Sequence, residues 1–470
     1  MLRPWEFNIE IDHNSDVAIY MQLADAIIAA IKNGQLPSGE ALPGSRLLAE
    51  QLQLNRNTVV EALNVLLAEG WLVSKERRGT FVADSLPSFK KVTASKQRSP
   101  AIKSPQSPII VFDDGLPDIK LAPMKELARA YRQLFSQQGR WLMMGYSCEL
   151  GDIKFRQAIV KMLNFKRGMQ VFEDEVCITR GSQMAMYLAS QCLFKKGDVV
   201  VVENPGYKPA SLAFESAGAS LLPLPIDSDG LIIATLEKQL KKQANIRAVY
   251  ITPHHQFPTT VTLSLQRRLE LVALSNQYGF TIIEDDYDNE FHFGQRPIMP
   301  VSSYAKSGSY IYIGTMSKIV APALRTGYLV ASPDFIAKIG QLRKIVDVQG
   351  DNIMERAVFE LIQQGEIKRH LKRAHATYKA KRDVFDEMLS KYVGNKISYT
   401  KPEGGLAYWI TPNKPTDLDK LMAALTRAGV QIISPGSFSY GTAINGLRLG
   451  YASLSEESME TGLKKLGKLL

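Results

Sequence analysis

Cysteine and histidine are scarce in this sequence. Its 470 residues include six histidines and three cysteines, which are Cys148, Cys177 and Cys192. Three cysteines without a regular spacing give neither an even disulfide framework nor a zinc-binding pattern. The histidines are scattered as well, so we expect no metal site and a chain that works in a reducing compartment.

Long apolar runs are also missing. No stretch reaches the roughly 18 consecutive apolar residues that a transmembrane helix needs. The N-terminus carries acidic residues where a signal peptide would be basic and then apolar. We therefore expect a cytoplasmic protein without a membrane partner. With 45% hydrophobic residues, the 470-residue chain is long enough for two or three domains with cores of their own.

The charge is unevenly distributed along the chain. The formal net charge is +10, yet residues 1–84 hold seven Lys or Arg against eleven Asp or Glu. Residues 85–108 contain six serines, four prolines, five basic residues and no acid. This composition predicts a flexible linker that buries no core. Its positive charge is compatible with a salt-sensitive contact to DNA phosphates and equally with a plain tether.

Residues 1–84 show the pattern of a winged helix-turn-helix. In the run AIYMQLADAIIAAIKNGQL, apolar residues recur at helical spacing until Gly34. A second short helix is expected at 45–53, and a third begins after Asn55, its expected N-cap. The buried positions should be Leu23, Ile27, Ile28 and Ile31 in the first helix and Val59, Leu63, Leu66 and Leu67 in the third. The run WLVSKERRGTFVAD then predicts two short strands around a basic turn.

Six residues of this domain are candidates for DNA contacts. Arg56, Asn57 and Thr58 open the third helix, where side chains can reach base edges in the major groove. Arg46, Arg77 and Arg78 are expected to meet phosphates. With Lys75, the arginines would form a local basic face despite the acidic balance of residues 1–84. A three-helix module that binds another protein is the alternative.

This segment resembles the GntR superfamily of bacterial transcription regulators. The run LPGSRLLAEQLQLNRNTVVEALNVLLAEGWL is similar to the second and third helices of that superfamily, and RRGTFV is similar to its wing. The family usually has serine or another small polar residue at the position of Asn55. The resemblance implies double-stranded operator DNA as a partner.

Lys318 is the first candidate for a cofactor site. It lies in GTMSKIVAPALRTGYLV, where an apolar strand delivers small hydroxyl residues, one lysine and then Arg325. A lysine amine can form a Schiff base with the aldehyde of pyridoxal 5'-phosphate (PLP), while Ser317 and Arg325 can hold its phosphate. A lone lysine is usually a solvated surface residue, so this interpretation needs support from other segments.

A second apolar strand ends in acids, in the run FTIIEDDYDNEF. A carboxylate at a strand end can keep the pyridine nitrogen of PLP protonated, and Glu284, Asp285 and Asp286 compete for this role. Tyr287 could donate to the ring oxygen. Taken alone, such an acidic cluster is more often a solvated turn.

Three further segments fit the same cofactor. VCITRGSQMAMYLA predicts a strand, a turn and a helix, with Gly181, Ser182 and Gln183 at a helix N-terminus suited to a phosphate. VVVENPGYKPA places Tyr207 where an aromatic ring could stack on the cofactor. In GLRLGYASL, Arg448 on a strand could bind a carboxylate through two hydrogen bonds. Taken alone, the first of these segments is also an ordinary strand-to-helix turn, and a lone arginine on a strand is more often a surface ion-pair partner.

In this order, the segments from about Val111 onward resemble the fold type I PLP enzymes of the aspartate aminotransferase family. The resemblance implies Lys318 as the Schiff-base residue, Asp285 as the pyridinium partner, Tyr287 at the ring oxygen and Tyr207 on the ring. Ser182, Gln183, Ser317 and Arg325 would serve the phosphate, and Arg448 would take the ligand carboxylate. Tyr146 matches the tyrosine that reaches the phosphate of the neighbouring subunit, so a homodimer is implied.

One segment departs from the aminotransferase pattern. The family carries Asn-Pro-Thr-Gly, whose asparagine touches the ring oxygen, whereas this chain has TPHHQFPTT with Phe257 in that position and Thr260 in place of the glycine. Because phenylalanine offers no donor, His255 or Gln256 would have to take over the contact. Efficient transamination is therefore in doubt.

The expected fold is a winged helix-turn-helix at 1–84, a linker at 85–108, a large α/β PLP-binding domain at 109–332 and a small α+β subdomain at 333–470. Alternating apolar strands and helices predict a parallel or mixed sheet that is buried on both faces. The combination resembles the MocR subgroup of bacterial transcription regulators, in which runs like EDDYDNEF and TPxHQFP recur.

The MocR resemblance implies a PLP-binding regulator that senses an amino-group effector by aldimine exchange at Lys318. It is also compatible with DNA-binding domains that are exchanged across the dimer. Such sensing requires the effector to bind two protein states differently. The alternatives are a sensor of PLP itself, a working aminotransferase with a DNA-binding appendage, and a degenerate fold that binds no cofactor.

Overall fold

The structure is a computed structural model that describes residues 9, 11–13, 15–76, 78–87, 109–136, 141, 144–242, 245–294, 298–305 and 308–470. The chain divides into two compact units, residues 1–103 and 104–470. Arg77 and residues 88–108, which make up most of the predicted linker, lie outside the described residues. In the described part, every helix is too short or too polar to cross a lipid bilayer.

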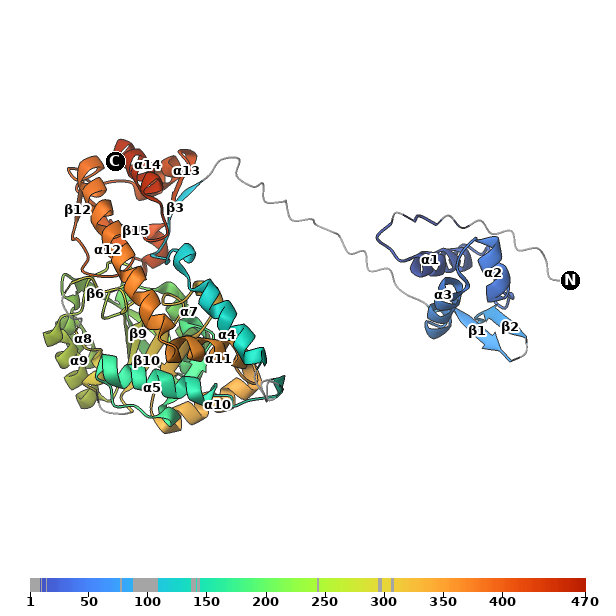
Figure 1. Cartoon of the computed structure of the whole chain (residues 1–470), viewed down its shortest axis with the longest axis horizontal. Helices are drawn as coiled ribbons and strands as arrows, with labels where there is room; N and C mark the ends of the chain where they lie inside the picture. Colours follow the sequence, from blue (N-terminus) through green and yellow to red (C-terminus); the bar gives the residue numbers. More distant parts are fainter. Residues whose placement is uncertain are drawn as a thin grey trace. The chain divides into compact units, whose positions relative to one another are not determined.

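The N-terminal unit contains three helices and a hairpin (Figure 1). Its elements are α1 (Ile19–Lys32), α2 (Ser45–Gln51), α3 (Arg56–Ala68), β1 (Leu72–Lys75) and β2 (Gly79–Val82), and the two strands are antiparallel. The side chain of Asn55 accepts a hydrogen bond from the Asn57 N–H at 2.9 Å, which caps α3 as predicted. The winged helix-turn-helix fold is confirmed.

The core of this unit forms where the apolar stripes of the helices meet. In α1, Leu23, Ile27 and Ile31 are buried as predicted, whereas Ile28 is half-buried. In α3, the predicted Val59, Leu63 and Leu66 are buried, and Leu67 is half-buried. The two exceptions lie at the edges of the stripes, and Ala24, Ala30, Leu48, Ala62, Trp71 and Val82 complete the core.

A mixed eight-stranded sheet forms the centre of the C-terminal unit, in the order β4-β11-β10-β9-β8-β5-β6-β7. The strands are β4 (Val176–Thr179), β5 (Val199–Asn204), β6 (Ser220–Asp227), β7 (Gly230–Leu231), β8 (Ile246–Ile251), β9 (Thr281–Asp286), β10 (Tyr310–Thr315) and β11 (Gly327–Val330). The central strands are parallel, and β11 runs antiparallel to both β4 and β10. The carboxyl ends of the parallel strands therefore meet at one edge of the sheet.

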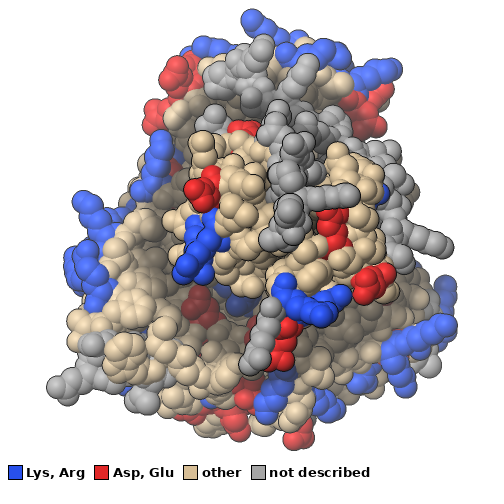
Figure 2. All heavy atoms as spheres, turned by 90° about the vertical axis from the view of Figure 1, so that its right-hand side faces the viewer, with Lys and Arg blue, Asp and Glu red and all other residues tan. Residues whose placement is uncertain are grey.

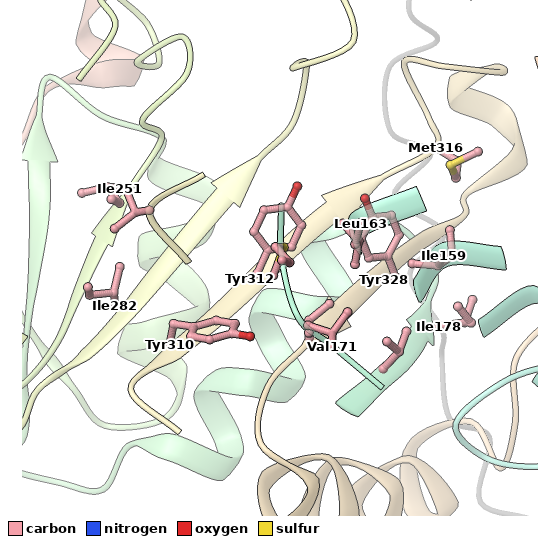
Figure 3. Close-up of a cluster of buried hydrophobic side chains, with 14 of the residues drawn as sticks. Ile159, Leu163, Val171, Ile178, Ile251, Ile282, Tyr310, Tyr312, Met316 and Tyr328 are labelled. Atoms are coloured by element: carbon pink, nitrogen blue, oxygen red, sulfur yellow. The ribbon is translucent and has the colours of Figure 1, made fainter. Parts of the chain in front are cut away.

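Helices cover both faces of this sheet, which is why its strands are apolar on both sides. One core includes side chains from α4 (Met124–Ser136), α5 (Ile153–Arg167), α8 (Ile233–Leu240), α9 (Leu265–Tyr278) and α11 (Asn352–Gln363). The other includes α6 (Ser182–Leu193), α7 (Lys208–Ser216) and α10 (Pro333–Val346). In the first core, Ile159 and Leu163 of α5 lie beside Tyr328 of β11 (Figure 3).

The small subdomain is built around the long helix α12 (Glu366–Tyr392). It contains a three-stranded sheet of β12 (Ile397–Tyr399), β13 (Ala407–Pro412) and β15 (Leu447–Gly450). The other elements are α13 (Leu418–Arg427), β14 (Val430–Ile432) and α14 (Glu456–Leu469).

One strand of the small subdomain comes from the start of the C-terminal unit. β3 (Ile110–Phe112) pairs in parallel with β14, and Phe112 is fully buried in the core of the small subdomain. The sequence expectation placed residues 109–332 together in the large domain. The structure differs at this strand because the side chain of Phe112 inserts between α12 and α14, where it lies near Phe385 and Gly462.

Candidate cofactor and ligand site

A cavity of about 190 Å³ lies at the carboxyl ends of the central strands, the usual ligand position in open α/β sheets. It is lined by Asp114, Leu116, Pro117, Ser182, Tyr207, Thr252, Phe257, Asp285, Tyr287, Thr315, Ser317, Lys318, Pro322 and Arg325. Segments that are far apart in the sequence thus contribute to one cavity, and seven of the residues proposed from sequence are among its walls.

Lys318 follows β10 and points its amine into this cavity. The Nζ atom donates a hydrogen bond to the backbone oxygen of Gly115 at 2.9 Å and lies 4.6 Å from the centre of the Tyr287 ring. Burial lowers the pKa of the Lys318 amine from its usual value, Arg448 acts in the same direction, and Asp288 and Asp114 oppose the shift. A larger share of neutral, nucleophilic amine follows from this.

Asp285 is the acid that faces the cavity. Its Oδ2 accepts a hydrogen bond from the Tyr250 hydroxyl at 3.0 Å, while its buried Oδ1 has no hydrogen-bond partner among the described residues. Burial raises the pKa of Asp285 to about 7, and the neighbouring Asp286 and Asp288 add to the shift. A buried carboxylate with one unpartnered oxygen fits a protonated pyridine nitrogen.

The two acids that compete with Asp285 have other partners. Glu284 accepts hydrogen bonds from the backbone N–H groups of Val301 and Ser302 and from the Ser302 hydroxyl. Asp286 lies 3.2 Å from Arg167 and 3.3 Å from His254. Neither acid lines the cavity, so its geometry favours Asp285 for the pyridinium role.

The opposite end of the cavity fits a phosphate. Gly181 precedes α6 with a positive φ of 77°, and a Cβ atom there would lie 2.8 Å from Nη2 of Arg325. The buried hydroxyl of Ser317 has no hydrogen-bond partner among the described residues. Together with Ser182 at the start of α6, these residues supply a guanidinium, hydroxyl donors and a helix N-terminus.

Gln183 lies differently from the other predicted phosphate residues. Its Nε2 donates to the backbone oxygen of Pro209 at 2.7 Å, and the residue does not line the cavity. Being one position further into α6, its side chain is directed toward the first turn of α7. Its proposed contact with the phosphate has no support in this geometry.

Aromatic rings form one wall of the cavity. The Tyr207 and Phe257 rings meet edge to face with centroids 5.1 Å apart, and the Phe257 and Tyr287 centroids are 6.1 Å apart. The Tyr287 hydroxyl donates to the backbone oxygen of His255 at 2.7 Å. Tyr207 and Tyr287 are thus at the cavity, as their predicted contacts with the cofactor ring require.

The proposed replacements for the missing asparagine have other contacts. His255 Nδ1 lies 2.7 Å from Oδ1 of Asp288, and the His255 ring is stacked on His292. Gln256 Nε2 donates to the backbone oxygens of Pro205 and Phe257. Neither residue lines the cavity. Thr252 does line the cavity, but its hydroxyl donates to Glu203 at 2.8 Å and accepts from the Phe257 N–H at 2.9 Å.

Arg448 is 1% exposed and does not line the cavity. Its Nε donates to the backbone oxygen of Asp114 at 2.8 Å and its Nη1 to that of Pro258 at 2.6 Å. The guanidinium carbon is 4.7 Å from the centre of the Phe257 ring, a cation–π distance. These two bonds use two of the five N–H groups of an arginine, and a ligand carboxylate that binds through Nε would replace the Asp114 carbonyl.

Sequence reasoning missed the segment after β3. Residues 113–117, here called the 113–117 segment, supply the carbonyl that Lys318 binds and one of the two that Arg448 binds. Asp114, Leu116 and Pro117 of this segment line the cavity. The only signal was an Asp-Asp-Gly turn after a short apolar strand. Thr252 and Tyr250 were also not predicted as site residues.

The predicted DNA-contacting residues lie at the surface of the N-terminal unit. Arg46, Arg56, Asn57 and Arg78 are exposed and Thr58 is half-buried, while Arg77 lies outside the described residues. On the face drawn in Figure 2, Lys and Arg side chains are mixed with Asp and Glu side chains and with wide uncharged areas. Because residues 1–84 hold more acidic than basic residues, charge alone does not identify the DNA-binding surface.

Family models match both units of the chain. Residues 114–466 match the model for aminotransferase class I and II. The chain belongs to the class I and II aminotransferase family. Residues 19–82 of this family member match a second model, bacterial regulatory proteins of the gntR family. Aminotransferases of this family depend on PLP, and PLP is therefore the cofactor of the domain.

Relatives of this aminotransferase-family chain include transcription regulators that match it over nearly their whole length. The probable rhizopine catabolism regulatory protein MocR of Rhizobium meliloti is 28% identical and covers 97% of this chain and 94% of its own length. The uncharacterized HTH-type transcriptional regulator YisV of Bacillus subtilis is also 28% identical, with 96% and 95% covered. A gntR-type domain ahead of an aminotransferase-type domain is the architecture of MocR-type regulators, so the chain is a DNA-binding transcription regulator of this kind.

Solved aminotransferase structures align with about three quarters of this chain. The α-aminoadipate aminotransferase LysN of Thermus thermophilus, complexed with N-(5'-phosphopyridoxyl)-L-leucine, aligns with a TM-score of 0.71 at 28% identity over 77% of this chain and 92% of LysN. The multiple substrate aminotransferase of Thermococcus profundus gives a TM-score of 0.73 at 27% identity, with 77% and 91% covered. The fold type I architecture predicted from the motifs is confirmed.

Proposed function

We propose that the chain is a PLP-dependent sensor of an amino-group ligand that adjusts its own affinity for operator DNA. One observation carries this proposal. Lys318 and Arg448, the two cations that would meet the ligand, both donate to carbonyls of the 113–117 segment. In the sequence, that segment follows β3, which itself follows the predicted linker to the DNA-binding domain.

When bound, PLP supplies an aldehyde carbon that reacts with amines. The residues of the chain have separate tasks around it. Asp285 would hold the ring nitrogen, while Ser182, Ser317 and Arg325 would hold the phosphate. The lowered pKa of Lys318 favours the neutral amine, which suits an exchange between lysine and a ligand amine.

Arg448 would bind the ligand carboxylate. The Nε atom of Arg448 donates to the carbonyl of Asp114 and its Nη1 atom to that of Pro258. A carboxylate that binds through the Nε side of the guanidinium would displace the Asp114 carbonyl. The ligand-bound and ligand-free states would then differ in the 113–117 segment. Differential binding of this kind is the thermodynamic requirement for a ligand to change DNA affinity.

The first experiment is a titration of full-length, PLP-loaded protein with a panel of amino acids. Visible absorbance reports reaction at the cofactor, product analysis reports keto acid, and the anisotropy of a labelled operator fragment reports DNA binding. A ligand that changes absorbance and DNA affinity without keto-acid release supports a sensor. Ligand binding with no change in DNA affinity contradicts it.

A working aminotransferase is the second candidate, since the catalytic lysine, the acid and the arginine lie together as in an enzyme site. Release of keto acid with conversion to the pyridoxamine form over many turnovers would establish it. A sensor of PLP itself predicts that the apoprotein and the PLP-loaded protein differ in DNA affinity without any amino acid. The same anisotropy assay distinguishes all three.

For the DNA-binding domain, we propose that Arg56, Asn57 and Thr58 read base edges and that Arg46, Arg77 and Arg78 contact phosphates. Arg56→Ala should lower the affinity for a selected operator about tenfold and relax its sequence preference. Arg78→Ala should weaken binding to all sequences and reduce the salt dependence by about one counterion. Equal effects of both variants on random DNA would contradict this division of roles.

A further inference from the structure

One charged group at the cavity has no task in the proposed function. Four charged residues line the cavity: Asp114, Asp285, Lys318 and Arg325. The cofactor ring, the reacting amine and the phosphate account for the last three. The Asp114 carboxylate forms no hydrogen bond or ion pair with any residue that the structure describes, and Asp114 is half-buried.

The position of Asp114 is fixed by its neighbours. The Asp113 carboxylate accepts hydrogen bonds from the N–H groups of Gly115 and Leu116, both at 2.8 Å, and from the Ser453 hydroxyl at 2.6 Å. Asp113 therefore has a structural role in the turn. The backbone oxygen of Asp114 is held by Arg448. This leaves the Asp114 side chain as the free acid on a fixed turn.

Gly115 explains why the turn can lie so close to the ligand-binding arginine. Its φ is +97°, and a Cβ atom there would lie 3.4 Å from Nη2 of Arg448 and 3.4 Å from Cβ of Ala407. A glycine tolerates both the backbone conformation and the close approach. The backbone of Asp114 and Gly115 therefore lies against the arginine that is proposed to bind a ligand carboxylate, while the Asp114 side chain lines the cavity.

The charge of Asp114 reaches the groups that surround the ligand position. Burial lowers the pKa of Lys318, and Asp114 acts against this shift. Burial also raises the pKa of Tyr207, with Asp285 and Asp114 adding to the effect. Asp114 thus places a negative group at the cavity wall, and the positive Arg448, which does not itself line the cavity, holds the backbone of the same turn. A ligand whose second polar group is cationic would satisfy both, whereas a second carboxylate would meet a like charge.

We infer that Asp114 determines ligand choice by binding the second ammonium group of a diamino acid and by disfavouring dicarboxylic amino acids. This inference rests on the proposed function, because it assumes that an amino acid binds with its carboxylate on Arg448. An ammonium–carboxylate hydrogen bond in a partly buried site is one of the stronger polar contacts in proteins.

Three amino acids with the same five-carbon chain provide the test: L-ornithine, L-norvaline and L-glutamate, which end in an ammonium, a methyl and a carboxylate group. For each amino acid, the concentration that half-saturates the PLP-loaded, full-length protein is measured by visible absorbance. It is measured independently by the anisotropy of the labelled operator. L-Ornithine should bind at least about tenfold more tightly than L-norvaline, and L-glutamate should bind most weakly.

Variants separate the charge of Asp114 from its structural surroundings. Asp114→Asn should reduce the preference for L-ornithine over L-norvaline to within about twofold and improve binding of L-glutamate. Asp114→Ser serves as a second neutral variant if the amide perturbs the turn. Asp334→Asn removes an exposed acid of α10 that does not line the cavity, and it should keep the ranking of the parent protein.

The outcomes for Asp114 and for the proposed function are distinguishable. L-Norvaline or L-glutamate binding as tightly as L-ornithine, or a preference that survives both Asp114 variants, would overturn the role of Asp114. If L-glutamate bound and changed DNA affinity, the sensor would stand and this inference would fall. If none of the three changed absorbance or DNA affinity, this inference would be refuted, and failure of the whole amino-acid panel would remove the proposed sensor with it.

Discussion

Three consecutive acids at the end of β9 have three different environments. Glu284 is held by backbone N–H groups of the following turn, and Asp285 faces the cavity. Asp286 is buried, and Arg167 and His254 hold its pKa below the usual range although burial acts in the opposite direction. Adjacent positions on a strand point to opposite faces, so neighbours in sequence need not share a function.

The first prediction concerns the pH dependence of the apoprotein. Burial raises the pKa of Asp285 to about 7, whereas an unfolded aspartate ionises near pH 4. Between about pH 4 and pH 7, the folded apoprotein therefore holds a proton on Asp285 that the unfolded chain has lost. The contribution of Asp285 to the free energy of unfolding falls as the pH rises through this range. Thermal unfolding is measured from pH 5 to pH 8. Over this range, the free energy of unfolding of Asp285→Asn should rise relative to that of the parent protein by an amount on the order of a few kcal/mol.

Comparison with Asp285→Asn is necessary because burial also raises the pKa values of Glu203 and Glu355 to about 7. These acids remain in both proteins, so the difference between the two curves isolates Asp285. Parallel curves across pH 5–8 would contradict the prediction. PLP binding should show the opposite trend and strengthen toward pH 8, since a pyridinium cation pairs with the ionised carboxylate.

Phe257 gives the second prediction. Its ring faces the Arg448 guanidinium at 4.7 Å and contacts the rings of Tyr207 and Tyr287. Phe257→Leu keeps an apolar side chain but removes the π face, which should cost on the order of 1 kcal/mol in the binding of a ligand carboxylate, a several-fold loss. The affinity is measured by absorbance titration with the best ligand of the panel.

A matched control for Phe257 is Phe438→Leu. The Phe438 ring is buried and packs on Phe257 with centroids 5.5 Å apart, but it does not line the cavity. Both variants should lower the unfolding temperature, whereas only Phe257→Leu should weaken ligand binding. Equal ligand affinities in the two variants would show that packing, and not the cation–π contact, positions Arg448.

For single residues, the sequence indicated a place at the site wherever that place follows from a local pattern. Lys318, Asp285 and Ser182 follow strands or open a helix, so their place at one edge of the sheet could be predicted. The cofactor contacts proposed for His255 and Gln183 stay predictions, because the orientation of these side chains depends on partners from distant segments, namely Asp288 and Pro209.

Among the elements, β3 has the greatest consequence for function. It is a three-residue strand that pairs only with β14 in the described part of the chain, and the Ile110 N–H donates to the Gly429 oxygen at 3.0 Å. The 113–117 segment begins directly after it. The predicted linker precedes it in the sequence. Movement at the ligand site would therefore reach the linker through β3.

The third prediction tests this element. Ile110→Pro removes the N–H that bonds to Gly429, so the pairing of β3 with β14 should be weakened. Absorbance titration should still show PLP and ligand binding, whereas the ratio of DNA affinities with and without ligand should fall toward one. Ile109→Pro, which lies just before the strand, should retain most of the ligand response. An unchanged response in Ile110→Pro would exclude β3 as the connection.

The helices of the N-terminal unit were predictable because their signals are local. Asn55 caps α3, and apolar residues at helical spacing form its buried face. The pairing of β3 with β14 joins Ile110 to Val430, and no local pattern in either segment indicates the other. Such long-range pairing depends on the packing of Phe112 in the small core, which the sequence alone does not reveal.

For the whole molecule, apolar exposure in the C-terminal unit points to a second subunit. The side chains of Trp141, Met144 and Tyr146 are exposed by 73%, 65% and 89%. Large apolar side chains gathered at one surface segment usually mark an interface. Dimers are typical of fold type I proteins, and we propose that Tyr146 reaches the phosphate of the partner's cofactor.

The last prediction follows from the position of Tyr146 on the surface, outside the cavity of its own chain. Tyr146→Phe removes only the hydroxyl and should weaken PLP binding several-fold, as expected for one lost hydrogen bond to a charged group. Lys318→Ala should abolish the covalent link to PLP. In a heterodimer of the two variants, one site combines Lys318 of the first chain with Tyr146 of the second, and the other site lacks both groups.

Co-expression with two different affinity tags isolates this heterodimer. If Tyr146 acts across the interface, one site per heterodimer should bind PLP covalently with the affinity of the parent protein, measured by absorbance during dilution. If Tyr146 acts within its own chain, the site that retains Lys318 also carries Tyr146→Phe, and its affinity should match that of the Tyr146→Phe homodimer. Parental affinity in half of the sites requires a cavity that is complete only in the dimer, because in the described residues Tyr146 contributes nothing to the cavity of its own chain.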